Sequence, residues 1–150
     1  GKLVRQVTKG GGIDVSPVYL PDGSGLLFAS ERGGGSQIYL QYNSGEAKRV
    51  SITGDFNIDP VVSPDGTKVA WVGRTPGGFD IFAADIDGRN TVRITQDTRD
   101  NEDPTWSPDG RYIVFSSTRG GRSDLWISTA DGRHQRQITK GGGWTQPTFL

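Results

Sequence analysis

Trp106-Ser107-Pro108-Asp109-Gly110 is the stretch that decides the fold, because it recurs along the chain at a nearly fixed interval. The same corner returns as Val62-Ser63-Pro64-Asp65-Gly66 and, less faithfully, as Tyr19-Leu20-Pro21-Asp22-Gly23, so the Asp-Gly pairs lie 43 and 44 residues apart. In each copy Pro presets φ at the second turn position, Asp bonds to the turn backbone, and Gly takes a positive φ. Such an interval is typical of proteins with one supersecondary unit per repeat.

The composition favours short strands joined by tight turns. The 150 residues include 23 Gly, and no segment shows the 3.6-residue period and the caps of a helix. The 17 basic residues balance 17 acidic ones, which gives no basis for binding nucleic acid or an anionic membrane. No apolar run has the length of a membrane span, and the absence of Cys removes disulfides and cysteine metal sites. We therefore expect an all-β protein with no nucleic-acid partner and no membrane insertion.

Each repeat is predicted to contain four strands. In the third repeat these strands are expected at 104–107, 111–117, 124–129 and 135–139. The third strand carries the apolar triplet Leu125-Trp126-Ile127, which suits a strand that is covered on both faces. Asp131-Gly132 then gives a strong hairpin signal before the fourth strand. Four antiparallel strands in about 40 residues are typical of a β-propeller blade.

Both ends of the chain carry partial repeats. The segment 5–12 is nearly identical to 136–143, so the chain begins with the last strand of a blade. We expect this strand and a loop at 1–16, followed by blades at 17–59, 60–103 and 104–146 and by the first strand of another blade at 147–150. Propellers have four or more blades, so three cannot close a ring. This predicts a half-propeller whose apolar blade faces favour pairing, as a homodimer or with a complementing half.

The repeat resembles a known family. Pro104-x-Trp106-Ser107-Pro108-Asp109-Gly110, followed by a strand and then by Asp124-Leu125-Trp126, is similar to the PD40 (WD40-like) repeat of TolB-type β-propellers. The resemblance implies the C-terminal half of a six-bladed periplasmic propeller, which binds a Pal-like lipoprotein in the Tol–Pal system and helps to maintain the outer membrane. The same repeat occurs in propellers of prolyl-oligopeptidase-type and tricorn-type peptidases, where it would act as a substrate filter. An engineered half-propeller that self-assembles is a further alternative.

Candidate binding residues lie on one rim of the predicted propeller. The Asp-Gly turns fall on the other rim, where we interpret them as structural. Charged loops on a rigid scaffold are where function concentrates. We predict that six loop residues contact a protein partner: Arg32, Asp59, Arg74, Asn101, Asp103 and Arg119. For the arginines the alternative is pairing with loop acids, which contributes about 0–1 kcal/mol per exposed pair.

Asp59 and Asp103 each precede the Pro that is expected to open the first strand of a blade, near the mouth of the central channel. Two interpretations remain open: the side chains cap loop amides, or they form a polar or cation-contacting ring. Carboxylate oxygens suit a hard cation such as Ca²⁺, although 97–103 lacks the ligand spacing of an EF-hand. We therefore predict no cofactor, with Ca²⁺ at the channel mouth as the alternative.

The sequence lacks the signatures of common enzymes. It contains no Gly-x-Ser-x-Gly elbow, no phosphate-binding P-loop and no His-Glu-x-x-His. His134 is the only histidine, and we interpret it as a solvated side chain on the rim of the Asp-Gly turns, which leaves no base for a Ser or Cys nucleophile. The sequence therefore predicts a protein without catalytic activity.

Overall fold

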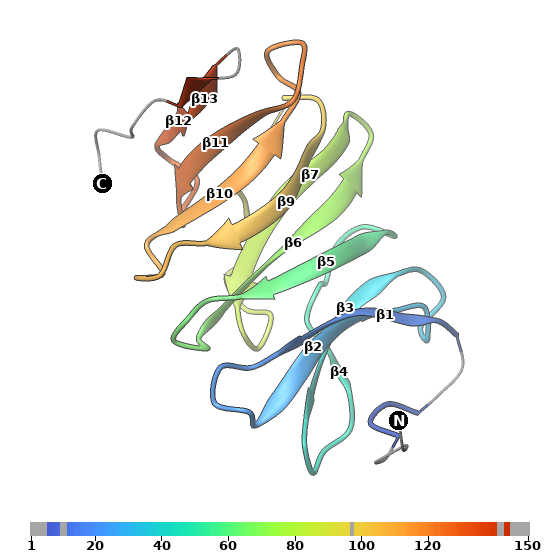
Figure 1. The fold of residues 1–150 in the computed structure, drawn as a ribbon. Helices are drawn as coiled ribbons and strands as arrows, with labels where there is room; N and C mark the ends of the chain where they lie inside the picture. The colour runs from blue at the N-terminus through green and yellow to red at the C-terminus, as the bar shows by residue number, and fades with distance from the viewer. Residues whose placement is uncertain (1–5, 10–11, 97, 141–142, 145–150) are drawn as a thin grey trace, which may run out of the picture.

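The computed structural model describes residues 6–9, 12–96, 98–140 and 143–144. Within these residues the chain forms strands and turns and no helix (Figure 1). Three antiparallel sheets follow one another along the chain, and each is a four-stranded meander. We call these sheets blades 1, 2 and 3. The predicted all-β architecture of four-stranded propeller blades is thus confirmed.

The first strands of adjacent blades contact one another at the inner edge of the stack. Blade 1 consists of β1 (Asp14–Tyr19), β2 (Gly25–Ser30), β3 (Gln37–Tyr42) and β4 (Lys48–Arg49). Blade 2 consists of β5 (Asn57–Val62), β6 (Lys68–Thr75), β7 (Gly78–Asp85) and β8 (Val92–Arg93). Blade 3 consists of β9 (Asn101–Trp106), β10 (Tyr112–Ser117), β11 (Asp124–Thr129) and β12 (Gln135–Gln137).

The repeated Pro-Asp-Gly corner joins the first two strands of each blade. In blade 2 the Asp65 carboxylate accepts hydrogen bonds from the Ser63 hydroxyl at 2.7 Å and from the backbone N–H of Thr67 at 3.0 Å. The Ser63 hydroxyl, followed by the hydroxyl and N–H of Thr67, lowers the pKa of Asp65 to about 2. Gly66 has φ 74°, and a carbon added to it would lie 3.6 Å from Pro21 Cδ. Corners of adjacent blades therefore lie close together along one rim.

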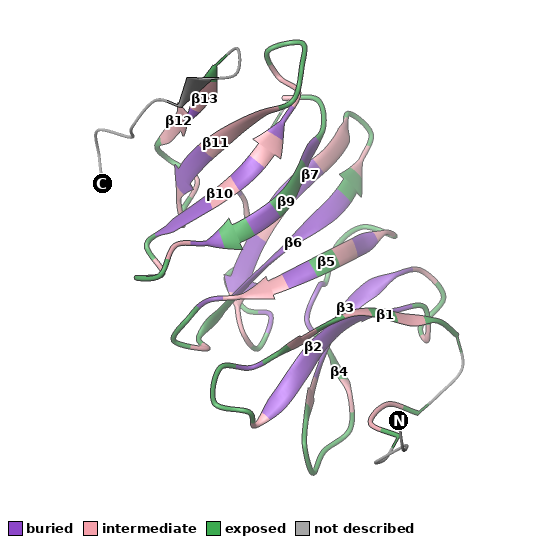
Figure 2. Ribbon diagram, in the orientation of Figure 1, coloured by how far each residue is buried: buried purple, intermediate pink, exposed green. Residues whose placement is uncertain are grey.

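The hydrophobic core lies between the blades. Strand β6 alternates, so that Val69 and Trp71 belong to the cluster shared with blade 1, while Ala70 and Val72 belong to the cluster shared with blade 3. All four side chains are buried, and the middle strands of the stack are mostly buried along their length (Figure 2). Each blade thus stabilises its neighbour by burying apolar surface at about 25 cal/mol per Å².

The first strand of each blade contains a bulge directly before a proline. The residues Ser16, Asp59 and Asp103 have φ of 56°, 54° and 54°, and the pairing register shifts at each of these places. We predicted that the first strand of blade 3 begins at Pro104, but β9 begins at Asn101, three residues earlier. The prediction was wrong because this proline lies inside the strand. Proline is tolerated at a bulge on an edge strand, where its missing N–H costs no ladder bond.

The chain ends differ from the prediction where they are described. Of the strand expected near the N-terminus, residues 6–9 are described and they form no strand. The last strand of blade 3 ends at Gln137 rather than Thr139, because β13 (Thr139–Lys140) pairs instead with β14 (Gly143–Trp144). The strand expected at 147–150 lies outside the described residues.

Candidate functional site

Three bulge residues from three blades meet at one hollow on the inner edge of the stack. Ser16, Asp59 and Asp103 line it together with the prolines that follow them and with Val18 and Val61, and its volume is about 310 Å³. The Ser16 hydroxyl donates a hydrogen bond of 3.1 Å to Asp59 Oδ1. We call this surface the inner-strand wall. It brings together two of the predicted partner-binding residues, Asp59 and Asp103. Two others, Arg119 and Asn101, are joined by a hydrogen bond of 3.4 Å within blade 3.

The backbone of the bulges leaves the side chains of Asp59 and Asp103 exposed. Pro60 and Pro104 are buried, whereas Asp59 and Asp103, the residues before them, are exposed. A positive φ at a non-glycine residue costs of order 1–3 kcal/mol, and Asp tolerates it better than most residues. The repetition of this costly conformation places a carboxylate at the same position in blades 2 and 3, and the Ser16 hydroxyl at that position in blade 1.

A third carboxylate, that of Glu102, adds negative charge beside the wall. Partial burial raises the pKa of Glu102, and repulsion from Asp103, Asp100 and Asp59 raises it further. Among the described residues, neither Asp59 nor Asp103 forms a salt bridge, so this negative charge is available to a positively charged group. No three His, Cys, Asp or Glu of the described part lie close enough together to hold a metal ion. The expected lack of a cofactor, with Ca²⁺ at the channel mouth as the alternative, stays a prediction.

Arg119 is half-buried and packs on side chains of its own blade. Its guanidinium stacks on Trp126, 4.1 Å from the ring centroid, and lies 5.6 Å from that of Phe115. Nε donates to the Ser117 hydroxyl at 2.9 Å, and a terminal nitrogen donates to Gln135 Oε1 at 2.9 Å. Burial lowers the pKa of Arg119. Most donors of this side chain are therefore used within its own blade.

Arg32 repeats this arrangement in blade 1. The guanidinium lies 5.0 Å from the Phe28 ring centroid and donates through Nε to the Ser30 hydroxyl at 3.0 Å. It also pairs with Asp14 at 3.2 Å. Burial acts to raise the pKa of Asp14, but hydrogen bonds from Ser30, Thr8 and Arg32 outweigh it, so the pKa is lowered.

Asn101 is fully buried at the junction of blades 2 and 3. Its Nδ2 donates to Asp80 Oδ1 of the preceding blade at 3.3 Å and to the Thr98 hydroxyl at 2.9 Å. Asp80 is itself buried and accepts hydrogen bonds from Thr95 at 2.7 Å and from Arg93 at 2.6 Å. Asn101 thus joins two blades and does not present its amide to solvent.

Arg74 remains exposed on the rim that carries the charged loops. Its guanidinium lies 4.8 Å from the centroid of Phe56 and 3.4 Å from Asp55 Oδ1, and about half of the side chain is accessible to solvent. Phe56 lies against Phe79, with ring centroids 6.4 Å apart. Arg74 is the predicted arginine that stays available to a partner, but it stands apart from the inner-strand wall.

Sequence reasoning missed Ser16, which lines the wall, and Glu102, which lies beside it. The signal for Ser16 was present, because Ser16-Pro17 precedes Asp59-Pro60 by the same 43 residues that separate the first two corners. Glu102 carried no periodic signal, since its counterparts in the other two blades are the apolar residues Val15 and Ile58.

Comparisons with known proteins agree on one family. The family model described as the TolB β-propeller domain (PD40) matches residues 1–149. The Tol-Pal system protein TolB of Bordetella pertussis is 46% identical over 39 residues, which cover 26% of this chain and 9% of that protein. No helix in the described residues is long and apolar enough to cross a membrane.

Solved TolB structures share the fold of most of this chain. A TolB-type structure from Agrobacterium tumefaciens has a TM-score of 0.80 at 30% identity, over 90% of this chain and 50% of that one. TolB from Acinetobacter baumannii has a TM-score of 0.76 at 32% identity, over 93% of this chain and 35% of that one. The chain thus spans half or less of the relatives that it matches. Peptidase propellers at 18% and 22% identity share the fold alone.

Proposed function

The chain belongs to the TolB β-propeller domain family, and on this basis we propose that it is a non-enzymatic protein-binding module of the Tol–Pal system. Its partner would be a Pal-like lipoprotein, its location the periplasm, and its role the maintenance of the outer membrane. The observation that carries the proposal is the inner-strand wall, where Asp59 and Asp103 lie exposed around one hollow without a salt bridge among the described residues.

The chemistry of the wall suits a partner segment that carries a basic side chain. The wall is built on strands, which hold their side chains more rigidly than loops do. Burial raises the pKa of Glu102 most, and repulsion from Asp103, Asp100 and Asp59 raises it further, so a cation that binds beside these carboxylates relieves part of that repulsion. Such charge complementarity increases the association rate and the specificity more than the affinity.

The test is a calorimetric titration of a purified Pal-like lipoprotein domain into this chain. The double variant Asp59→Asn/Asp103→Asn is expected to bind at least about tenfold more weakly and with a smaller salt dependence. The matched control is Asp87→Asn/Asp131→Asn, which removes two carboxylates from the opposite rim and should leave the affinity unchanged. Equal binding by both double variants would reject the wall as the site, and no binding by the unaltered chain would reject the Pal-like partner.

The second candidate function, a substrate filter in a peptidase, draws support from the shared fold alone. An α/β-hydrolase segment with a Ser nucleophile encoded next to this chain would favour it over the protein-binding module. The other expected partner, a second copy of the chain or a complementing half-propeller, stays a prediction.

A further inference from the structure

A hollow of about 370 Å³ lies between the Pro-Asp-Gly corners of blades 1 and 2, on the rim that runs along the left of Figure 1. Its lining includes Asp22 of one corner, Asp65 of the other and Tyr42 at the end of β3. The Tyr42 side chain is 45% exposed. We call this surface the corner hollow. Its volume lies within the range of ligand sites, about 300–1,000 Å³.

Each of the two carboxylates uses one oxygen to build its own turn. Asp22 Oδ1 accepts hydrogen bonds from the N–H and the hydroxyl of Ser24 at 2.9 and 2.7 Å. Asp65 Oδ1 accepts from the hydroxyls of Ser63 and Thr67, both at 2.7 Å. These bonds lower the pKa of both side chains, that of Asp65 to about 2, so both are ionised at neutral pH. Among the described residues, neither Oδ2 accepts a hydrogen bond and neither carboxylate forms a salt bridge.

The other three Asp-Gly turns occupy the second oxygen with an arginine that follows the glycine. These turns read Asp-Gly-Arg at 87–89, 109–111 and 131–133, whereas the corners of the hollow read Asp-Gly-Ser and Asp-Gly-Thr. Arg111 Nε donates to Asp109 Oδ2 at 2.7 Å, and its guanidinium lies 5.3 Å from the ring centroid of Tyr112. In the turns at 87–89 and 131–133 the arginine lies 3.5 and 3.9 Å from the aspartate Oδ2. A guanidinium is therefore the group that this chain itself places on such a corner.

The equivalent place between blades 2 and 3 already has its charges paired. Asp85 stands at the position of Tyr42, and its carboxylate pairs with Lys68 of the opposite strand at 2.5 Å. Gly25 stands at the position of Lys68, so the residue opposite Tyr42 has no side chain that could cover its ring. Within the described residues, two unpaired corner carboxylates and an exposed ring thus come together at the junction of blades 1 and 2.

We propose that the corner hollow binds an arginine side chain of a partner polypeptide. The free oxygens of Asp22 and Asp65 would accept hydrogen bonds from its guanidinium, and the exposed ring of Tyr42 would stack on it. Arg111 makes both kinds of contact within blade 3. A planar guanidinium with five donors suits carboxylates and an aromatic face better than an ammonium group does. This site lies away from the inner-strand wall and does not depend on the partner proposed for the wall.

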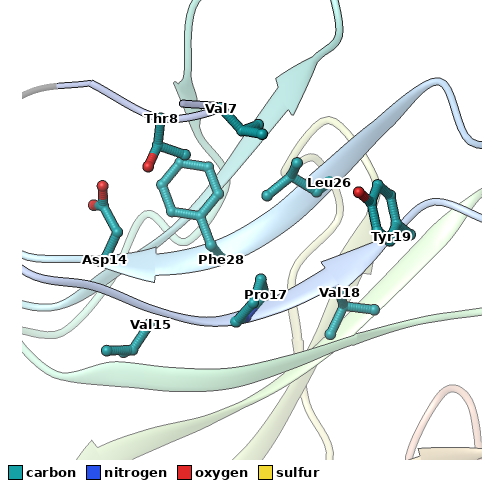
Figure 3. Close-up of a pocket in the computed structure, with 9 residues that line it drawn as sticks. All are labelled: Val7, Thr8, Asp14, Val15, Pro17, Val18, Tyr19, Leu26 and Phe28. Carbon is teal, nitrogen blue, oxygen red and sulfur yellow. The ribbon is translucent and has the colours of Figure 1, made fainter. Parts of the chain in front are cut away.

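The corner hollow differs from another hollow, which lies against β1 and β2 (Figure 3). That hollow has a volume of about 320 Å³, and Pro17, Leu26 and Phe28 are among the apolar residues that line it. Asp14 is the acidic residue of its lining, and the carboxylate pairs with Arg32 at 3.2 Å. The hollow in Figure 3 therefore offers no unpaired carboxylate to a guanidinium.

The test is a titration of the isotope-labelled chain with the peptide acetyl-Gly-Arg-Gly-amide, followed by the amide signals in NMR spectra. We expect a dissociation constant of about 1 mM and shifts centred on Gly23 and Gly66. The peptide with Lys in place of Arg should bind at least about threefold more weakly, and the peptide with Gln should not bind. Equal affinity for the Arg and Lys peptides, shifts centred on the inner-strand wall, or no binding of the Arg peptide would each overturn the proposal.

A double variant tests whether the free corner oxygens hold the peptide. Ser24→Arg/Thr67→Arg gives both corners the Asp-Gly-Arg sequence that the chain already folds at 109–111, so its own arginines should take the two oxygens. We expect the Arg peptide to bind at least about tenfold more weakly. Binding equal to that of the native chain would overturn the proposal.

The matched control is Asp87→Asn/Asp131→Asn, which changes the net charge of the same rim by the same amount. Both of its carboxylates already have an arginine beside them, so the affinity for the Arg peptide should stay unchanged. A loss as large as that of the double arginine variant would mean general attraction to acidic surface and would overturn the site. Tyr42→Leu keeps an apolar side chain without an aromatic face and should weaken binding at least about threefold. The titration with a Pal-like domain uses another ligand and other residues, so either proposal can fail alone.

Discussion

Replacing Arg119 with Lys separates a structural role from a partner-binding role. Lysine keeps the positive charge and the aliphatic stem, but it cannot stack a planar guanidinium on Trp126 or donate to Ser117 and Gln135 together. Each lost hydrogen bond costs about 0.5–1.5 kcal/mol, and the lost stacking costs about 0.5–1 kcal/mol. Because Arg119 is only partly buried, we take the lower part of these ranges and expect a loss of about 2 kcal/mol in the free energy of unfolding.

The assay is thermal unfolding followed by circular dichroism. For a chain of this length a loss of about 2 kcal/mol corresponds to a fall in Tm of about 4–8 °C. Arg74→Lys is the control, because the Arg74 side chain is half exposed and its ion pair with Asp55 is weak, so it should lose less than about 1 kcal/mol. If Arg119→Lys leaves Tm unchanged and weakens partner binding instead, the assignment of Arg119 to the blade interior is refuted.

Three further predictions concern the blade junctions and corners. Trp71→Phe removes the N–H that donates to buried Asn57 Oδ1 at 3.0 Å. It should lower the free energy of unfolding, measured in urea, by about 1–3 kcal/mol, and a variant as stable as the native chain would contradict this. Gly73→Ala places a carbon 2.6 Å from the same oxygen. It should lower the free energy of unfolding by about 1–3 kcal/mol in the same assay, and unchanged stability would contradict this by showing that the junction relaxes. The pKa of Asp65 and of Asp109 is lowered from 3.8 to about 2, so their stabilising contribution is present above pH 3.8 and is lost as the pH falls toward 2. Tm measured across this range should fall less steeply in Asp65→Asn/Asp109→Asn than in the native chain, and parallel slopes would disprove the contribution.

The fold could be predicted from the sequence because the corner and the strand pattern repeat. Three copies at intervals of 43 and 44 residues fix the number of blades and the approximate position of every strand. The start of the first strand in each blade could not be predicted in the same way. Proline suggests the beginning of a strand, yet Pro60 and Pro104 lie within strands whose bulges depend on tertiary packing.

The roles of the rim residues were harder to predict than the fold. Asp59 and Asp103 do lie at one surface, because equivalent positions in consecutive blades are neighbours. Arg119 lies in the turn between β10 and β11, as expected, but sequence spacing does not reveal that it stacks on Trp126 of β11. Asn101 lies beside charged loop residues in the sequence although its side chain is fully buried. Burial of a single polar side chain depends on the neighbouring blade, which local sequence does not describe.

Because each hydrophobic cluster is shared by two blades, the blades should differ in how readily they open. Blade 2 contributes to both interblade clusters, whereas blades 1 and 3 each contribute to one. Opening an end blade therefore breaks one interface, but opening the middle blade breaks two, as in a one-dimensional array with nearest-neighbour coupling. Amide hydrogen exchange should accordingly be slowest around Trp71 and Ile81 and become faster toward either end of the stack. A partner or a second copy that covers an end blade would then slow exchange there most, and the middle blade would change least.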